Sequence, residues 1–198
     1  ETKDKGIKPT PSIGGVGLIK NYENMISMSL KSDGNIILVI GKTIGHLDQS
    51  IFAREIFSEK KGPPPEINLF NEKNNGLIVL KLINNNLIES CHDISLGGIL
   101  VAASKMCIKS GKGIKLNQLK TLVNKFEYFF GEDQARYLIE INKNNLQKVK
   151  SLLKESSISF DELGTVTKEK LEFGDEINLN VSDLNNSFKN WLRKYMVN

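Results

Sequence analysis

The sequence predicts a layered α/β (α+β) domain in which a mixed β-sheet is flanked by helices. Short apolar runs typical of strands, such as 35–40 and 135–141, lie between segments of helical periodicity, such as 144–156. The predicted order is neither strict strand–helix alternation nor strands alone, which favours a mixed sheet. A length of 198 residues with 39% hydrophobic content suits one domain with a sizeable core.

The N-terminal half is expected to contain two strands followed by two helices. Lys31–Gly34 is expected to join the strands as a hairpin-like turn, and the segment 41–50 is expected to be a loop. Pro63–Pro65 separates the two helices. In order, the expected elements are strand 25–30, strand 35–40, helix 49–58 and helix 66–84.

The C-terminal half is expected to alternate helices and strands. Ser182 or Asp183 is expected to cap the last helix, which carries Leu184, Phe188, Trp191 and Leu192 at helical spacing. In order, the elements are a short helix 117–124, strand 135–141, helix 144–156, strands 158–167 and 171–181, and that last helix.

The stretch His-Asp-Ile-Ser-Leu-Gly-Gly at 92–98 is predicted to be a polar turn between a strand at 87–91 and a helix that ends before Gly111. Glycine costs about 1 kcal/mol relative to alanine in a helix, so a pair in the first turn needs a reason. Either another backbone packs closely here, with Gly14–Gly15 as a candidate, or the N–H groups face an anion at the positive helix end. The candidate anion-side residues are His92, Asp93, Ser95, Gly97 and Gly98, with Ser95 or Asp93 as the cap.

Composition excludes several function classes. The formal net charge is +4, but no basic run is interleaved with aromatic residues, which argues against nucleic-acid binding. No apolar run approaches the roughly 20 residues of a membrane span. Cys91 and Cys107 show neither metal-ligand spacing nor a disulfide framework, so a reducing cytoplasm fits best.

The N-terminal segment is expected to be a linker. Residues 8–17 carry two prolines and three glycines, but no strand precedes them, so they do not form a dinucleotide-binding fingerprint. Glu1 in place of an initiator methionine indicates a fragment of a longer chain, or a processed one. We therefore expect a linker over 1–17, from an absent upstream domain, and a single domain over 18–198.

Several segments together resemble one family, the C-terminal domain of the synthetase subunit of phosphoribosylformylglycinamidine synthase, within the aminoimidazole-ribotide-synthetase-like superfamily. One departure is Asp48, where the family usually has glycine. The segments that carry the resemblance are PTPSIGGVGLI at 9–19, LVIGKTIGHLDQSIFAREI at 38–56, NGLIVLKLI at 75–83, HDISLGGILVAASKM at 92–106, FFGEDQARYLIEI at 129–141, LGTVT at 163–167 and WLRKYM at 191–196.

The resemblance implies a ligase of purine biosynthesis. The full enzyme uses ATP and magnesium to convert formylglycinamide ribotide to formylglycinamidine ribotide with glutamine-derived ammonia. Its implied partners are upstream domains of the same polypeptide, a glutaminase subunit and a small accessory subunit. ATP and magnesium are expected to bind mostly outside this fragment, so the fragment alone is expected to be inactive.

The loop with Glu132, Asp133, Gln134 and Arg136 resembles the loop that holds the ribotide in the first half of the enzyme. Here it is expected to face a pseudo-symmetric, non-catalytic site. The alternative is a structural role in which Glu132 and Arg136 form a surface or interdomain ion pair. His92 is likewise expected either as a neutral core histidine or as an anion contact.

Three functional hypotheses follow. The chain is part of the amidine-forming ligase, part of a related ATP-using enzyme, or a structural and subunit-docking module without its own ligand. The related enzymes are aminoimidazole ribotide synthetase, selenophosphate synthetase and thiamine-monophosphate kinase. A domain of a larger enzyme is also expected to expose an apolar patch, here near the PTPSIGG segment at 9–15 and the turn at 97–98.

Overall fold

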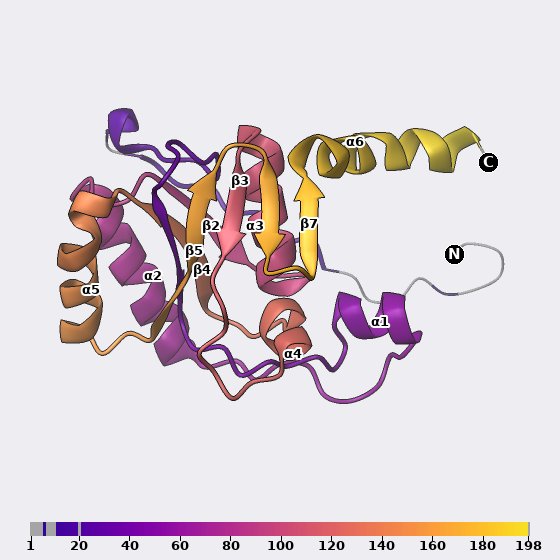
Figure 1. The fold of residues 1–198 in the computed structure, drawn as a ribbon. Coiled ribbons are helices and arrows are strands. Elements are labelled where there is room, and N and C mark those ends of the chain that lie inside the picture. Colours follow the sequence, from indigo (N-terminus) through magenta and orange to yellow (C-terminus); the bar gives the residue numbers. More distant parts are fainter. Residues whose placement is uncertain (1–5, 7–10, 20, 198) are drawn as a thin grey trace.

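The computed structural model describes residues 6, 11–19 and 21–197, and these contain a seven-stranded mixed sheet (Figure 1). The strand order is β2-β4-β1-β5-β3-β6-β7; β3 pairs with β6 in parallel, and the other neighbours pair antiparallel. The predicted mixed sheet is therefore confirmed. The strands are β1 Ile36–Ile40, β2 Ser90–Ile94, β3 Gly113–Leu116, β4 Arg136–Ile141, β5 Phe160–Thr167, β6 Lys170–Phe173 and β7 Ile177–Asn180.

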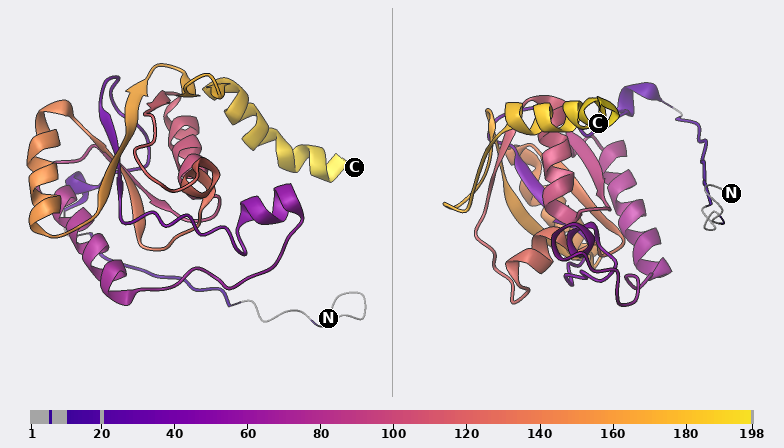
Figure 2. Two further views of the ribbon diagram at one scale, coloured as in Figure 1. Left: turned by 60° about the horizontal axis from the view of Figure 1, so that its bottom comes forward. Right: turned by 90° about the vertical axis from the view of Figure 1, so that its right-hand side faces the viewer.

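Helices flank the sheet, as the predicted layered class requires (Figures 1 and 2). One layer contains α2 and α5, and the other contains α3 and α4. The helices are α1 Ile51–Phe57, α2 Leu69–Asn84, α3 Gly98–Ser110, α4 Lys125–Phe130, α5 Leu146–Glu155 and α6 Val181–Val197, with single 3₁₀ turns at Tyr22–Asn24 and Lys143–Asn145. In the described part of the chain, no helix is long and apolar enough to cross a membrane.

The central strand β1 shows why helices must cover both faces of the sheet. Ile37 and Val39 belong to the core formed with α3 and α4, whereas Leu38 and Ile40 belong to the core formed with α2 and α5. Successive strand residues point to opposite faces, so an unbroken apolar run suits a strand buried on both sides.

Two predicted elements are wrong, because a helix cap and a glycine turn place the start of α4 and the end of β6 elsewhere than expected. The predicted helix at 117–124 is irregular, and α4 begins only at Lys125. There Asn124 and Glu127 form a capping box, which fixes the helix start. The predicted strand 171–181 is instead the hairpin of β6 and β7, broken at Gly174, whose φ is +50°.

The predicted strand at 25–30 is also absent. Within this segment, Leu30 is buried and Met28 packs against the core. The apolar pattern of residues 25–30 therefore reflects burial, not pairing with a neighbouring strand. The Cys91 N–H donates to the Ser27 carbonyl at 3.1 Å, which joins the segment to β2. Of the expected linker, residues 1–5 and 7–10 lie outside the described residues, and residues 11–17 are exposed without regular structure.

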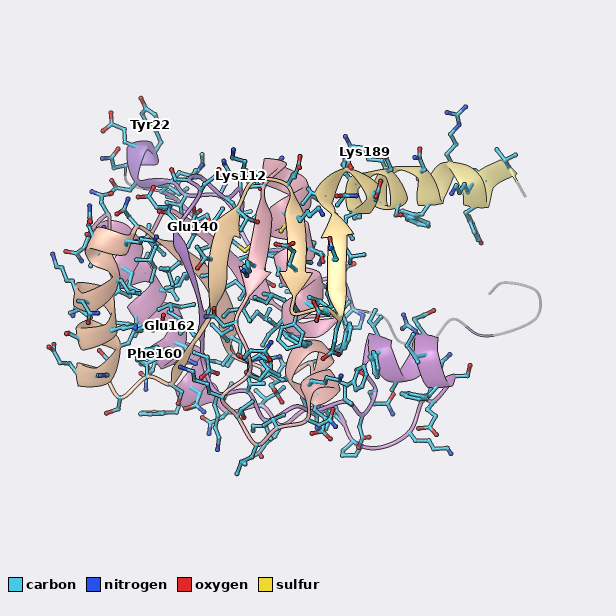
Figure 3. The ribbon with its side chains drawn as sticks, in the orientation of Figure 1. Tyr22, Lys112, Glu140, Phe160, Glu162 and Lys189 are labelled. Atoms are coloured by element: carbon cyan, nitrogen blue, oxygen red, sulfur yellow. The ribbon has the colours of Figure 1, made fainter. Side chains whose placement is uncertain are left out.

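A buried carboxylate, Glu140, ties this N-terminal region to the sheet. Glu140 lies on β4 and is fully buried (Figure 3). Its carboxylate accepts hydrogen bonds from the backbone N–H groups of Lys31 and Ser32, from the Asn35 amide and from the Ser90 hydroxyl, at 2.8–3.1 Å. Sequence reasoning missed it; the only signal was one acidic residue inside the apolar strand run RYLIEI.

We expect Glu140→Gln to lower the free energy of unfolding by about 2–4 kcal/mol, because an amide group then faces several buried donors with only one acceptor oxygen. Urea denaturation measures this change. Glu162→Gln on β5 is the matched control: its carboxylate is part of an exposed ion pair with Lys150, so its effect should stay within about 1 kcal/mol. Equal stability of the two variants would contradict the structural role of Glu140.

Candidate functional site

The predicted loop residues gather between α4 and β4, but they do not share one environment. Glu132, Asp133 and Arg136 are buried, with exposed fractions of 8%, 5% and 1%. Gln134 alone among the four is exposed. Three of these polar side chains therefore point into the domain and one faces outward.

Asp133 holds the loop between β1 and α1. Its Oδ2 atom accepts the N–H groups of Ile44 and Gly45 at 2.9 Å each, and Oδ1 accepts the N–H group of His46 at 3.1 Å. A charged acceptor makes such bonds stronger than neutral ones. The conformation of residues 44–46 is thus set by a side chain almost 90 positions later in the chain.

Glu132 joins the beginnings of two helices. Its Oε1 atom accepts the N–H group of Ile51, the first residue of α1, and that of Gly97, the N-cap of α3, both at 2.8 Å. Helix N-termini carry unsatisfied donors and a partial positive charge. The Glu132 carboxylate therefore occupies the position that an external anion would take at α3.

Arg136, the first residue of β4, anchors the loop through its guanidinium group. Its guanidinium donates to the carbonyls of Asp133 (3.1 Å) and Gly131 (2.6 Å) and to the Thr43 hydroxyl (3.2 Å), and Nη1 lies 3.5 Å from Asp133 Oδ2. Burial lowers the pKa of Arg136, and the Asp133 carboxylate opposes that shift. The predicted Glu132–Arg136 ion pair is wrong: Glu132 is engaged by backbone N–H groups, and Arg136 pairs with Asp133 in a buried position instead.

The structure has the close packing expected at the glycine turn, with a different partner. A Cβ atom on Gly98 would lie 2.7–2.8 Å from the backbone of residues 129–131, and the φ of Gly98 is +69°. The predicted packing against Gly14–Gly15 is therefore wrong. The Gly97 N–H donates to Glu132 and the Gly98 N–H to the Ser95 carbonyl, so both donors proposed for an anion are engaged within the chain.

The remaining turn candidates lie elsewhere than predicted. His92 and Asp93 belong to β2, because strand pairing with β4 extends through Ile94. Neither Asp93 nor Ser95 caps α3; Gly97 occupies the N-cap with a φ of +84° and no side-chain cap. The strand therefore begins three residues later than expected, and the turn is shorter.

His92 is a mostly buried side chain, 12% exposed, whose Nδ1 atom lies 3.2 Å from Asp93 Oδ1. Its buried Nε2 atom has no hydrogen-bond partner in the described structure. Burial lowers the pKa of His92 below its ordinary value, and Asp93 partly opposes this. These features fit the neutral core histidine rather than the anion contact.

A polar cleft of about 340 Å³ lies beside the outer side of the loop. The buried Asn75 of α2 donates to the Ala135 carbonyl at 2.8 Å and fixes one wall. His46 Nε2 donates to the Pro63 carbonyl at 3.0 Å and positions the opposite segment. Sequence reasoning missed Lys42 and the asparagines of α2, for which the only signal was an asparagine-rich first half of that helix. The lining residues are Lys42, Ile44, His46, Pro65, Glu66, Asn68, Asn71, Asn75, Asp133, Gln134 and Ala135.

Two kinds of group bear on the chemistry open to this region, metal-ligand clusters and reactive thiols. Among the described residues, no group of three or more His, Cys, Asp or Glu side chains is placed to hold a metal ion. Burial raises the pKa of Cys91 and of Cys107 to about 12, so neither free thiol ionises readily as a nucleophile. The cleft is lined by amide, imidazole, ammonium and carboxylate groups.

Comparison with known proteins assigns the class. Residues 32–175 match the family described as AIR synthase related protein, C-terminal domain, and the chain belongs to this family. Among curated relatives, the synthase subunit PurL (phosphoribosylformylglycinamidine synthase) of Pelagibacter ubique is 60% identical over the whole chain, and that of Bartonella bacilliformis is 41% identical. The chain spans 27% of the length of each.

Solved structures share the fold. A structure of Thermotoga maritima PurL complexed with FGAR matches with a TM-score of 0.67 at 18% identity, covering 82% of this chain and 30% of that one. Escherichia coli HypE, a hydrogenase maturation protein, matches with a TM-score of 0.56 at 15% identity, covering 79% of this chain and 52% of that one. At these identities the likeness concerns the fold alone.

We expect Gly98→Ala to destabilise the domain by about 2–4 kcal/mol, because the new methyl group adds overpacking to left-handed strain. Gly111→Ala at the other end of α3 is the control, since its φ is +75° but nothing lies within 4 Å of the added Cβ. It should cost only the backbone strain, about 1–2 kcal/mol. Thermal and urea unfolding measure both; equal losses would mean that the contact with residues 129–131 is not tight.

A second prediction concerns pH. Because the fold keeps His92 neutral, the unfolded state binds more protons below about pH 6.5, and the free energy of unfolding should fall as the pH decreases through that range. His92→Gln should show a shallower fall between about pH 7.5 and about pH 5.5. Urea titrations at several pH values measure the slope. An unchanged slope in the variant would show that His92 protonates equally in both states.

Proposed function

We propose that this chain is the C-terminal domain of the synthetase subunit of a phosphoribosylformylglycinamidine synthase. The full enzyme would convert formylglycinamide ribotide to formylglycinamidine ribotide in purine biosynthesis, using ATP and glutamine-derived ammonia, in the cytoplasm. The 60% identity to the Pelagibacter ubique subunit over the entire chain carries this proposal. The 41% identity to the Bartonella bacilliformis subunit favours it over the related ATP-using enzymes.

The domain's share of the work would be to bind and position rather than to activate phosphate. Related Thermotoga maritima PurL structures are described as complexed with ATP and with AMPPCP. In this chain, the carboxylates of Glu132 and Asp133 are already engaged by backbone N–H groups, which leaves them poorly suited to a metal ion. We therefore assign ATP and magnesium mostly to the part of the subunit outside this chain.

The loop at 132–136 would form one wall of the pseudo-symmetric site. Gln134 is the loop candidate whose side chain is exposed beside the cleft, together with Lys42 and Asn71. Glu132, Asp133 and Arg136 would act indirectly, by holding that wall in place. In this proposal the turn at Ser95–Gly98 is a structural support for the loop, not a ligand contact.

The partners would be the upstream domains, a glutaminase subunit and a small accessory subunit. A Thermotoga maritima structure described as PurLQS supports a multi-subunit assembly. Residues 1–17 would link this domain, residues 18–198, to the upstream part. Exposed side chains such as Ile13, Val16 and Leu18 support such a docked position and fit the docking role considered as the alternative.

The test is a chimera in which this chain replaces the matching segment of the Pelagibacter ubique subunit. We expect the chimera to form formylglycinamidine ribotide from formylglycinamide ribotide, ATP and ammonia, because the domain is a close relative of the one it replaces. The 198-residue chain alone should form none. Liquid chromatography with mass spectrometry measures the product.

The matching segment of Escherichia coli HypE at the same junction is the control, since it shares the fold at 15% identity and should not restore activity. A folded but inactive chimera would contradict the proposal, and so would product formation by the isolated chain.

A further inference from the structure

The apolar stripe of α6 runs from the domain core into open surface. At its start, Val181 is buried and Leu184 packs partly against the core. Residues at spacings of three and four then continue the same face of the helix. These continuing residues are all exposed, by 57% at Phe188, 58% at Trp191, 51% at Leu192 and 74% at Tyr195.

The position of α6 explains this change. Its first turns lie beside α3 and β7, whereas its C-terminal half extends away from the sheet and the other helices (Figures 1 and 2). An isolated helical segment of this length is marginal in water, and contiguous exposed aromatic residues are uncommon on monomers. The projecting half of α6 therefore has the character of a docking element.

The charges beside the stripe indicate what kind of surface it fits. Lys189 and Lys194 flank the apolar stripe on its two sides, whereas Arg193 lies with Asn190 on the opposite side of the helix. Lys189 is labelled on the projecting helix in Figure 3. The one acidic residue of α6, Asp183, lies in its first turn and accepts a hydrogen bond from Asn180. The projecting half thus carries only positive charge, which favours an acidic partner and disfavours a second copy of the same helix.

We propose that the C-terminal half of α6 docks into a groove on the remaining part of the full-length synthetase subunit, with an apolar floor and a rim of Asp and Glu side chains. This inference rests on the proposed function. The curated relatives are nearly four times as long as this chain, so most of such a subunit is covalently tethered to the domain. Tethering raises the effective concentration of the groove to the millimolar range, about 10⁻³ M.

Trp191 lies at the centre of the exposed stripe and is the single tryptophan of the chain. Tryptophan and tyrosine are enriched among residues that dominate interface energies. We therefore assign Trp191 and Tyr195 as the main anchors. The basic residues beside them would orient the helix and exclude neutral grooves.

Hydroxyl-radical footprinting tests the proposal on the active chimera described above and on the 198-residue chain. Oxidation of Trp191 and Tyr195 should be about fivefold slower in the chimera, as expected when exposed side chains enter an interface core. Tyr22, which is 79% exposed and lies far from α6 in Figure 3, is the internal control and should react equally in both. Because the chimera must first show synthase activity, a missing protection would overturn the docking proposal and leave the proposed function standing.

Paired variants of the chimera sharpen the result. Trp191→Ser should restore rapid oxidation of Tyr195, and Lys194→Glu, at the edge of the stripe, should do so in part, because it places a carboxylate against the acidic rim. Asn190→Ser, on the opposite side of the same helix, should leave Tyr195 protected. Loss of protection in the Asn190 variant, or full protection in the Trp191 variant, would contradict a specific groove.

Other occupants give distinct outcomes. Protection of Trp191 in the 198-residue chain that rises with protein concentration, together with a dimer in sedimentation, would assign the stripe to a second copy. Protection of the isolated chain by phosphatidylglycerol vesicles, with none in the vesicle-free chimera, would assign it to a membrane surface. Either result would overturn the proposal.

Discussion

The loop between α4 and β4 supplies the anions on which the neighbouring structure depends. Its two buried carboxylates, Glu132 and Asp133, bind five backbone N–H groups from the loop after β1, the first turn of α1 and the N-cap of α3. Buried charge is costly unless it is fully hydrogen-bonded, so these contacts must form together. One short loop therefore fixes the positions of three segments that are distant in the sequence.

The glycine turn completes this arrangement sterically. Gly98 lets α3 begin against the backbone of residues 129–131, which brings the Gly97 N–H within 2.8 Å of the Glu132 carboxylate. A larger residue would push the helix away and leave the carboxylate with an unpaired lone pair in a buried site. Packing and electrostatics thus impose the same geometry, and the polar cleft next to Gln134 has a rigid wall as a result.

Several helices and strands depend mainly on interactions between residues close in the sequence, and these elements were predicted. The helix α3 and its stop at Gly111, the strand β4 and the helix α5 follow from periodicity and capping signals, and all were predicted. Non-local contacts were beyond reach: no pattern within the sequence reports that Asp133 accepts the N–H groups of residues 44–46, or that residues 129–131 pack on Gly98. The family resemblance singled out this loop, and the structure adds what the sequence could not show, that three of its four polar side chains are buried.

The domain satisfies its buried carboxylates internally and leaves apolar side chains exposed on its surface. Its buried carboxylates find backbone donors within the chain, yet Trp191, Tyr195 and the side chains of residues 13–19 stay exposed. A domain that folded and acted alone would have the opposite balance, with its apolar side chains covered and its polar groups turned toward a ligand. The physical design therefore fits a part that is rigid in itself and whose remaining surface is completed by other portions of a larger enzyme.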